Sequence, residues 1–277
     1  MPLSYGKSTG LGGRASQQDQ LLVVENLFGN SEYYLFGVFD GHGSEGRTAA
    51  DFAKGVVPEI INSLEEIYKK DPVAALKTLF ETINTKMCDD PSLDAYMSGS
   101  TCSVAVITDS QLAVANVGDS RVIIALKDGD SQEYQTLQLS RDHTCEDEEE
   151  HQRVTSCGAR VDRLDSSESG EKEGPLRIFK GSLPYPGIVV TRTLGDTVAA
   201  KLGVICEPDV SVQQIDPSSD ALLVLGSDGV WDGLSNQDVI DIVKANLGDI
   251  QKASKLVTKK SITGMQKKNM ASFDLFF

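Results

Sequence analysis

Long apolar runs are missing from this sequence, and none approaches the ~18–20 residues that a membrane-spanning helix needs. The N-terminal residues contain no apolar signal core, and the five cysteines include no C-x-x-C pair. These absences disfavour a membrane-spanning protein, a secreted protein, and a protein stabilised by disulfide bonds or by a zinc site. We expect a protein of the cytoplasm or nucleus with reduced thiols.

Basic residues are also scarce. Lys and Arg number 26 against 41 Asp and Glu, so the formal net charge is −15. Such a chain repels nucleic acid and anionic membranes, and we expect neither as a partner. The same charge suits a protein that concentrates divalent cations.

Internal repeats and linkers are absent as well. The composition of the 277 residues is ordinary for a globular protein, with 40% apolar and 24% charged residues. No Gly-, Ser- or Pro-rich stretch divides the chain, so we expect a single domain over residues 1–277, present as a monomer. The polar segment Asp165–Lys180 is expected to be a mobile excursion within that domain.

Short apolar runs bounded by Gly, Asp and Asn predict strands. Several carry Val, Ile and Ala at consecutive positions, which indicates burial on both faces. Strands that cluster, instead of alternating with helices, predict an α+β fold with sheets packed between helical layers. The clearest strands are Tyr34–Phe39, Thr101–Ile107, Leu112–Val117, Val122–Leu126, Ile188–Val190, Val210–Ile215 and Ala221–Leu225.

Helices are predicted by apolar residues at three- and four-residue spacing between Ala49 and Ile67. Asp71-Pro72 supplies the start of a second helix, and Ser235 with Asp238 forms a capping-box-like start of another. Two shorter elements are expected, a helix over Asp147–Cys157 and a last strand over Ser272–Phe277.

Two apolar runs end in Asp-Gly. FGVFDGHG contains Asp40, Gly41 and His42, and LLVLGSDGVWD contains Asp228 and Asp232. Asp-Gly is commonly a turn dipeptide, yet both copies lead toward a helix and not into a partner strand. A carboxylate at a rigid strand end, beside a glycine whose carbonyl is accessible, supplies the oxygen ligands that Mg²⁺ prefers. The pattern favours a cation site, with simple turns as the alternative.

Further acids follow other apolar runs. Asp119 lies in VGDSR, Asp142 in SRDH and Asp196 in RTLGD, while Arg14 precedes Asp19 in GGRASQQDQ. A guanidinium beside a metal cluster is the expected partner of a doubly charged phosphate. The alternative for Arg14 is an ordinary surface arginine.

Seven segments occur in the order found in the protein phosphatase 2C family, the metal-dependent Ser/Thr phosphatases, and the chain resembles that family from about Gly6 to the C-terminus. The resemblance implies a β-sandwich of two antiparallel sheets flanked by helix pairs, with a variable flap around residues 165–187 beside the active site. It implies hydrolysis of phosphoserine and phosphothreonine in phosphoprotein substrates by a metal-activated water. The segments are RASQQDQ, VFDGHG, SGSTCSVAVI, VANVGDSR, LSRDH, VVTRTLGD and LGSDGVWD.

The resemblance also implies a metal centre with two Mg²⁺ or Mn²⁺ ions. Asp40 would bridge the ions, the Gly41 carbonyl would be a further ligand, and Asp228 would hold one of them. Asp19 would order the waters around the ions. A third, weaker metal position would be formed by Asp142 and Asp232 with Asp228.

The same resemblance assigns the catalytic side chains. Arg14 would clamp the substrate phosphate, and His42 would protonate the leaving serine or threonine oxygen. The alternative for His42 is a hydrogen-bonded turn histidine. Asp119 and Asp196 would be structural. The sequence has no C-x₅-R or G-x-x-x-x-G-K-[ST] motif that would indicate another phosphatase or nucleotide-hydrolase chemistry.

One position departs from the family pattern. The family ends in a strand preceded by Asp-Asn, whose Asp binds metal, and the matching stretch KKNMASFDLFF has Lys268 at that position. At ~5 Å, with an effective dielectric near 20, a lysine charge would be repelled from a divalent ion by roughly 6–7 kcal/mol before the side chain relaxes. We expect one weakened metal site. The alternative function is a weakly active or inactive pseudophosphatase that binds phosphoproteins or acts as a regulatory domain.

The acidic segment CEDEEEH, Cys145–His151, is another candidate for metal binding. Consecutive acids on a helix cannot all face one ion, and acids near a helix N-terminus are stabilised by the helix dipole. We expect this segment to be a solvated helix start.

Overall fold

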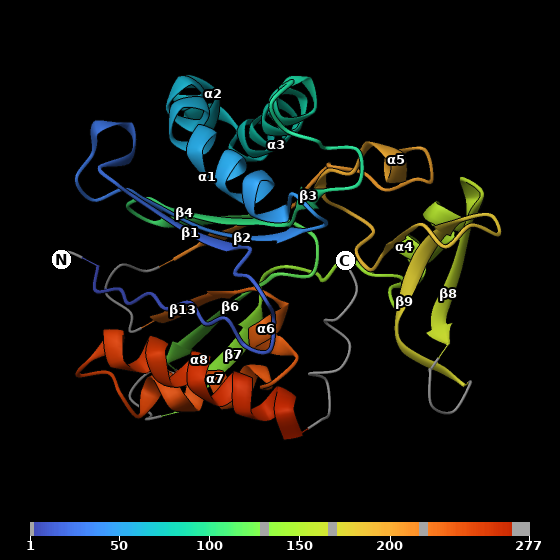
Figure 1. Ribbon diagram of the computed structural model, residues 1–277. Coiled ribbons are helices and arrows are strands. Elements are labelled where there is room, and N and C mark those ends of the chain that lie inside the picture. Colours follow the sequence, from blue (N-terminus) through green and yellow to red (C-terminus); the bar gives the residue numbers. More distant parts are fainter. Residues whose placement is uncertain (1–2, 128–132, 166–170, 216–220, 268–277) are drawn as a thin grey trace.

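Two antiparallel sheets are stacked between two layers of helices (Figure 1). The computed structural model describes residues 3–127, 133–165, 171–215 and 221–267. One helical layer contains α1 (Gly46–Ser63), α2 (Glu65–Lys70) and α3 (Pro72–Asp89), and the other contains α7 (Asn236–Lys244) and α8 (Ile250–Lys267).

The larger sheet has seven strands in the order β11-β3-β2-β4-β5-β12, with β1 paired to β2. The smaller sheet has the order β13-β6-β7. In the larger sheet the strands are β1 (Asp19–Glu25), β2 (Tyr34–His42), β3 (Gly99–Ser100), β4 (Cys102–Ile107), β5 (Gln111–Val117), β11 (Leu194–Gly195) and β12 (Asp209–Gln214). In the smaller sheet they are β6 (Arg121–Lys127), β7 (Tyr134–Gln138) and β13 (Ala221–Gly226).

Alternating side chains of the central strands build three successive core layers. On β6, Val122 and Ile124 face the interior of the sandwich, whereas Ile123 and Ala125 pack with Trp231 and the apolar residues of α7 and α8. On β5, Leu112 and Val114 face the sandwich interior, and the alternate residues belong to the core beneath α1 and α3. Burial on both faces, expected from consecutive apolar residues, is therefore confirmed.

The segment expected to be a polar excursion contains regular structure. β8 (Ala159–Asp165), β9 (Lys172–Lys180) and β10 (Pro186–Ile188) form a three-stranded sheet beside the sandwich (Figure 1). Ile178 of β9 packs with Val154 of α4 (Glu148–Ser156) and Ala199 of α5 (Thr197–Ala200) in a separate small core. The flap is thus built on a β-sheet, and its mobility stays a prediction.

Helix starts follow the predicted capping residues. The Asp71 side chain accepts a hydrogen bond from the backbone N–H of Ala74, and Ser235 and Asp238 form a reciprocal capping box at α7. The expected helix over residues 49–67 is divided into α1 and α2 at Leu64. Lys268 and the expected last strand Ser272–Phe277 lie outside the described residues. None of the helices in the described part of the chain has the length and apolar character required to cross a bilayer.

Candidate active site

The candidate site begins where β1 and β2 lie side by side. The register pairs Asp19, the first residue of β1, with Asp40 near the end of β2. Asp40 is only 6% exposed, and its backbone N–H donates to Thr101 Oγ1 at 3.0 Å while its carbonyl accepts from the Thr101 N–H at 2.9 Å. The apolar run that precedes Asp40 thus delivers a carboxylate on a rigid, buried strand end.

The second half of the site comes from the other sheet. After β13 ends at Gly226, the Ser227 hydroxyl donates to Asp19 Oδ2 at 2.9 Å, and Asp228 begins the short helix α6 (Asp228–Trp231). This hydrogen bond joins residues 208 positions apart in sequence. The two Asp-Gly segments therefore converge at one end of the sandwich.

The buried carboxyl groups of this site raise one another's pKa. Burial, and then the neighbouring carboxylates of Asp228, Asp19 and Asp119, raise the pKa of Asp40 well above its usual range. Burial and Asp228 likewise raise the pKa of Asp19. The Arg14 guanidinium opposes both shifts, which places Arg14 at the cluster instead of on a distant surface.

Asp119 belongs to this carboxylate cluster, although the family resemblance had implied a structural role. Burial raises the pKa of Asp119 well above its usual range, and Asp228, Asp142 and Asp232 contribute to the increase. Asp142 itself forms a two-pronged ion pair with Arg121, with Nε–Oδ1 3.0 Å and Nη2–Oδ2 2.5 Å. Its carboxylate is therefore already paired with a guanidinium. Asp119 is a further candidate for a peripheral cation ligand, and the roles of Asp142 and Asp232 there stay predictions.

The end of β2, Asp40–His42, is closed against the start of α1. A side chain at Gly41 would clash with the carbonyl of Gly46, and one at Gly43, where φ is +83°, would clash with the carbonyl of Met97. The Gln18 side chain donates to the Gly43 carbonyl at 3.0 Å. The glycines thus permit the close backbone approach that keeps His42 beside Asp40.

His42 is held by a carboxylate that sequence analysis left as structural. Its Nε2 lies 2.5 Å from Oδ2 of Asp196, a residue only 3% exposed and in a left-handed backbone conformation with φ 48°. Burial would lower the pKa of His42, but the Asp196 carboxylate outweighs burial and the pKa is raised. A side chain at Gly99 would clash with this Asp196 carboxylate. The contact therefore depends on glycine in the S-G-S segment.

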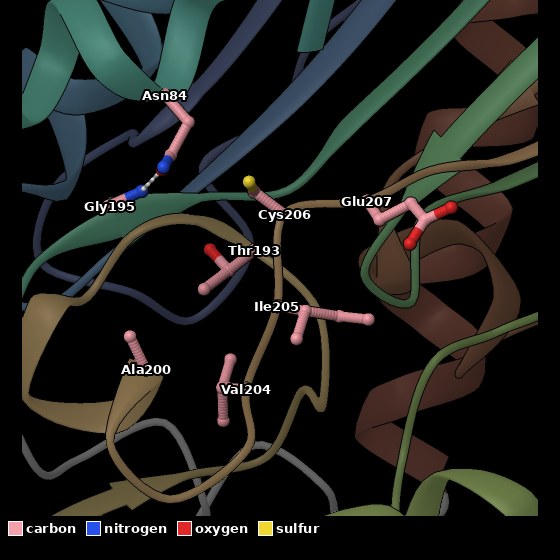
Figure 2. Close-up of a pocket in the computed structure, with 8 residues that line it drawn as sticks. All are labelled: Asn84, Thr193, Gly195, Ala200, Val204, Ile205, Cys206 and Glu207. Carbon is pink, nitrogen blue, oxygen red and sulfur yellow. Dashed lines mark hydrogen bonds between the residues drawn. The ribbon is translucent and has the colours of Figure 1, made fainter. Parts of the chain in front are cut away.

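A cavity of about 380 Å³ lies beside the segment that carries Asp196, the hydrogen-bond partner of His42 (Figure 2). Its lining includes Thr193 and Gly195, which flank the Leu194 backbone, together with Cys206. Asn84 Oδ1 accepts from the Gly195 N–H at 2.9 Å across one wall, as the dashed line in Figure 2 shows. None of the candidate metal ligands lines this cavity, so it is distinct from the carboxylate cluster.

The donor set fits a hard divalent cation. Within the described residues, no three His, Cys, Asp or Glu side chains are grouped as direct ligands of one ion. Mg²⁺ commonly retains several waters and is held by only one or two carboxylates. Buried like-charged carboxyl groups with raised pKa values need positive charge to remain ionised together. Asp40, Asp228 and the adjacent Gly41 carbonyl fit this requirement.

The acidic segment Cys145–His151 is a helix start, as predicted, but one of its acids is not solvated. Asp147 caps α4, whereas the Glu150 side chain is 1% exposed and accepts hydrogen bonds from Arg153 (2.5 Å) and Arg192 (2.7 Å). Burial alone would raise the pKa of Glu150, but these guanidinium groups hold it well below its usual range. Glu150 therefore joins α4 to the segment that leads to Asp196.

Comparisons with known proteins agree with this fold. A profile of the protein phosphatase 2C family matches residues 3–270. The chain is 36% identical over 239 residues to probable protein phosphatase 2C 35 of Arabidopsis thaliana, and 30% identical over 259 residues to protein phosphatase 1L of Bos taurus. These alignments cover 82% and 90% of the chain but only 67% and 66% of the relatives. The chain thus spans about two thirds of their length.

A solved serine-threonine phosphatase 2C from Toxoplasma gondii has the same fold, with a TM-score of 0.80, 21% identity, and coverage of 97% of this chain and 92% of that one. The fold and the convergent Asp-Gly segments define a sandwich of the phosphatase 2C class. The chain belongs to the protein phosphatase 2C family.

Proposed function

We propose that this chain is a Mg²⁺- or Mn²⁺-dependent protein serine/threonine phosphatase. The observation that supports this most is the convergence of Asp40 and Asp228, from different sheets, on one cluster that also includes Arg14. A divalent cation bound there would neutralise phosphate oxygens and make a coordinated water more acidic. Because a phosphomonoester dianion repels nucleophiles, positioning and charge neutralisation are the main requirements.

The chain's own side chains would provide the remaining functions. Arg14 would bind the phosphate oxygens through its guanidinium. Asp19, oriented by Ser227, would accept hydrogen bonds from water at the cation. His42 would donate a proton from its ring to the departing serine or threonine oxygen, and Asp196 would orient the ring and keep it protonated.

The test is hydrolysis of p-nitrophenyl phosphate and of a phosphothreonine peptide in the presence of Mn²⁺. The Asp40→Asn variant is the control, because it retains the size of the side chain and removes one cation ligand. We expect wild-type activity on both substrates, its loss on chelation with EDTA, and a loss of at least about 100-fold in the variant. Hydrolysis that survives both EDTA and Asp40→Asn would refute the proposal.

A further inference from the structure

Two consecutive large apolar side chains are exposed between α3 and β3. Tyr96 is 51% and Met97 37% exposed, whereas the nearby Leu93 and Ala95 are buried. Nowhere else in the described ranges are two consecutive large hydrophobic residues both exposed. Contiguous exposed apolar surface is a feature of binding sites, since water contact with such groups is unfavourable.

The backbone of this segment is fixed, so its exposed side chains are not the consequence of a loose loop. The Ala95 and Tyr96 carbonyls accept hydrogen bonds from the N–H groups of Thr197 (3.0 Å) and Val198 (3.1 Å) at α5. The Tyr96 N–H donates to Asp94 Oδ1 at 3.0 Å. A surface whose backbone is already ordered loses less conformational entropy when it binds a partner.

The position of the pair relates it to His42. Gly99 pairs with His42 across β2 and β3, and Met97 lies two residues before Gly99. The Met97 carbonyl lies against Gly43, the residue after His42, since a side chain at Gly43 would clash with this carbonyl. An extended peptide advances by about 3.3–3.6 Å per residue, so two or three of its residues span roughly 7–10 Å. Side chains two or three residues from a phosphorylated residue at His42 would therefore reach this surface.

The proposed chemistry at His42 determines which part of the substrate lies beside this residue. In the proposed reaction His42 protonates the oxygen that remains with the polypeptide, so the substrate chain must pass beside His42. Exposed carboxylates flank the apolar pair, with Asp94 on the same segment and Glu45 joined to Ser98 by a 3.0 Å hydrogen bond from its N–H to Ser98 Oγ. The surroundings therefore favour apolar and basic side chains over acidic ones.

We infer that Tyr96 and Met97 form a docking surface for an apolar side chain located two or three residues from the phosphorylated serine or threonine of a substrate. This inference rests on the proposed function and specifies the class of substrate. The selected peptides carry an apolar residue at that distance, together with basic residues.

The experiment compares two fluorescent phosphothreonine peptides with the same basic residues. They differ only in leucine or glycine at the positions two residues before and after the phosphothreonine. Each is measured with the wild type, with the double variant Tyr96→Ala/Met97→Ala, and with the control Tyr5→Ala. Tyr5 is a comparable 40% exposed aromatic residue, but it packs against Phe36, six residues before His42 on β2.

Partial burial of one leucine predicts that the wild type prefers the leucine peptide by about 5–10-fold in kcat/KM. The double variant should reduce this preference below about 2-fold, and Tyr5→Ala should retain it. A wild type that does not discriminate, or a double variant with undiminished preference, would overturn the inference.

Fluorescence anisotropy of the same peptides separates this inference from the proposed function. If the wild type hydrolyses neither the peptides nor p-nitrophenyl phosphate, the phosphatase proposal fails, and the leucine preference in binding decides the docking surface. A binding preference lost in the double variant supports docking without catalysis. Equal binding of both peptides rejects it.

Discussion

Asp196→Asn tests the role of His42 most selectively. The substitution removes the negative charge opposite His42 Nε2, which is 2.5 Å from Asp196 Oδ2. It also retains a residue type that tolerates the left-handed backbone of position 196, where φ is 48°. The perturbation is thus confined to the charge and to the acceptor of the hydrogen bond.

The expected loss follows from the geometry. With charge centres ~4 Å apart and an effective dielectric near 20, the attraction is about 4 kcal/mol, equivalent to about a 10³-fold change. Burial of His42 offsets part of this attraction, so we expect kcat/KM for a phosphothreonine peptide to fall about 100-fold. General acid catalysis typically contributes ~10²–10⁴-fold, which is consistent with this value.

The assay compares two leaving groups. p-Nitrophenolate departs without much help from an acid, whereas a threonine alkoxide needs a proton. Asp196→Asn should therefore reduce p-nitrophenyl phosphate hydrolysis by less than about 10-fold while peptide hydrolysis falls about 100-fold. The raised pKa of His42 keeps its ring protonated to higher pH. The alkaline limb of peptide hydrolysis should accordingly move to lower pH in the variant.

The control for this prediction is the His42→Gln background. If Asp196 acts only through His42, the double variant His42→Gln/Asp196→Asn should be no slower than His42→Gln alone. Equal losses on both substrates, or additive losses in the double variant, would refute the reasoning.

Two further predictions concern stability and metal affinity. Glu150→Gln should lower the free energy of unfolding by about 3 kcal/mol at pH 7, because the buried Arg192 loses one of its two carboxylate partners and keeps only Asp209. Since the folded-state pKa of Glu150 is lowered, the carboxylate stabilises the fold at pH values above its unfolded pKa of about 4.3, and this stabilisation declines on acidification. In urea unfolding, the stabilities of wild type and variant should therefore converge below pH 4. A stability difference that does not change with pH would contradict this. Lys268→Asp should tighten Mn²⁺ binding by at least about 10-fold in calorimetry and raise phosphatase activity, because it replaces a positive charge with a negative one. Two tight Mn²⁺ sites in the wild-type protein would contradict the expectation of a weakened site.

The sequence was sufficient where one local rule acted alone. The core strands were predictable because apolar residues at consecutive positions require burial on both faces, as at Val122 and Ile123. The start of α7 was predictable because Ser235 and Asp238 form the cap with each other. At the site, the Asp-Gly strand ends were recognisable because both led toward helices.

Features that depend on long-range packing were not predictable in the same way. The contact of Asp196 with His42 joins residues 154 positions apart and needs Gly99 between them. The burial of Glu150 depends on Arg192, 42 residues later. The β8–β9 hairpin was missed because its residues are mostly polar and partly exposed, so they lack the apolar alternation typical of a strand.

The central claim is that Asp40 and Asp228 share a divalent cation. The most direct measurement is anomalous scattering from a crystal of the wild-type protein soaked in Mn²⁺. We predict an anomalous peak within coordinating distance of both Asp40 and Asp228, which disappears in Asp40→Asn. The absence of an anomalous peak at Asp40 and Asp228, or a manganese ion bound only elsewhere on the molecule, would contradict the account.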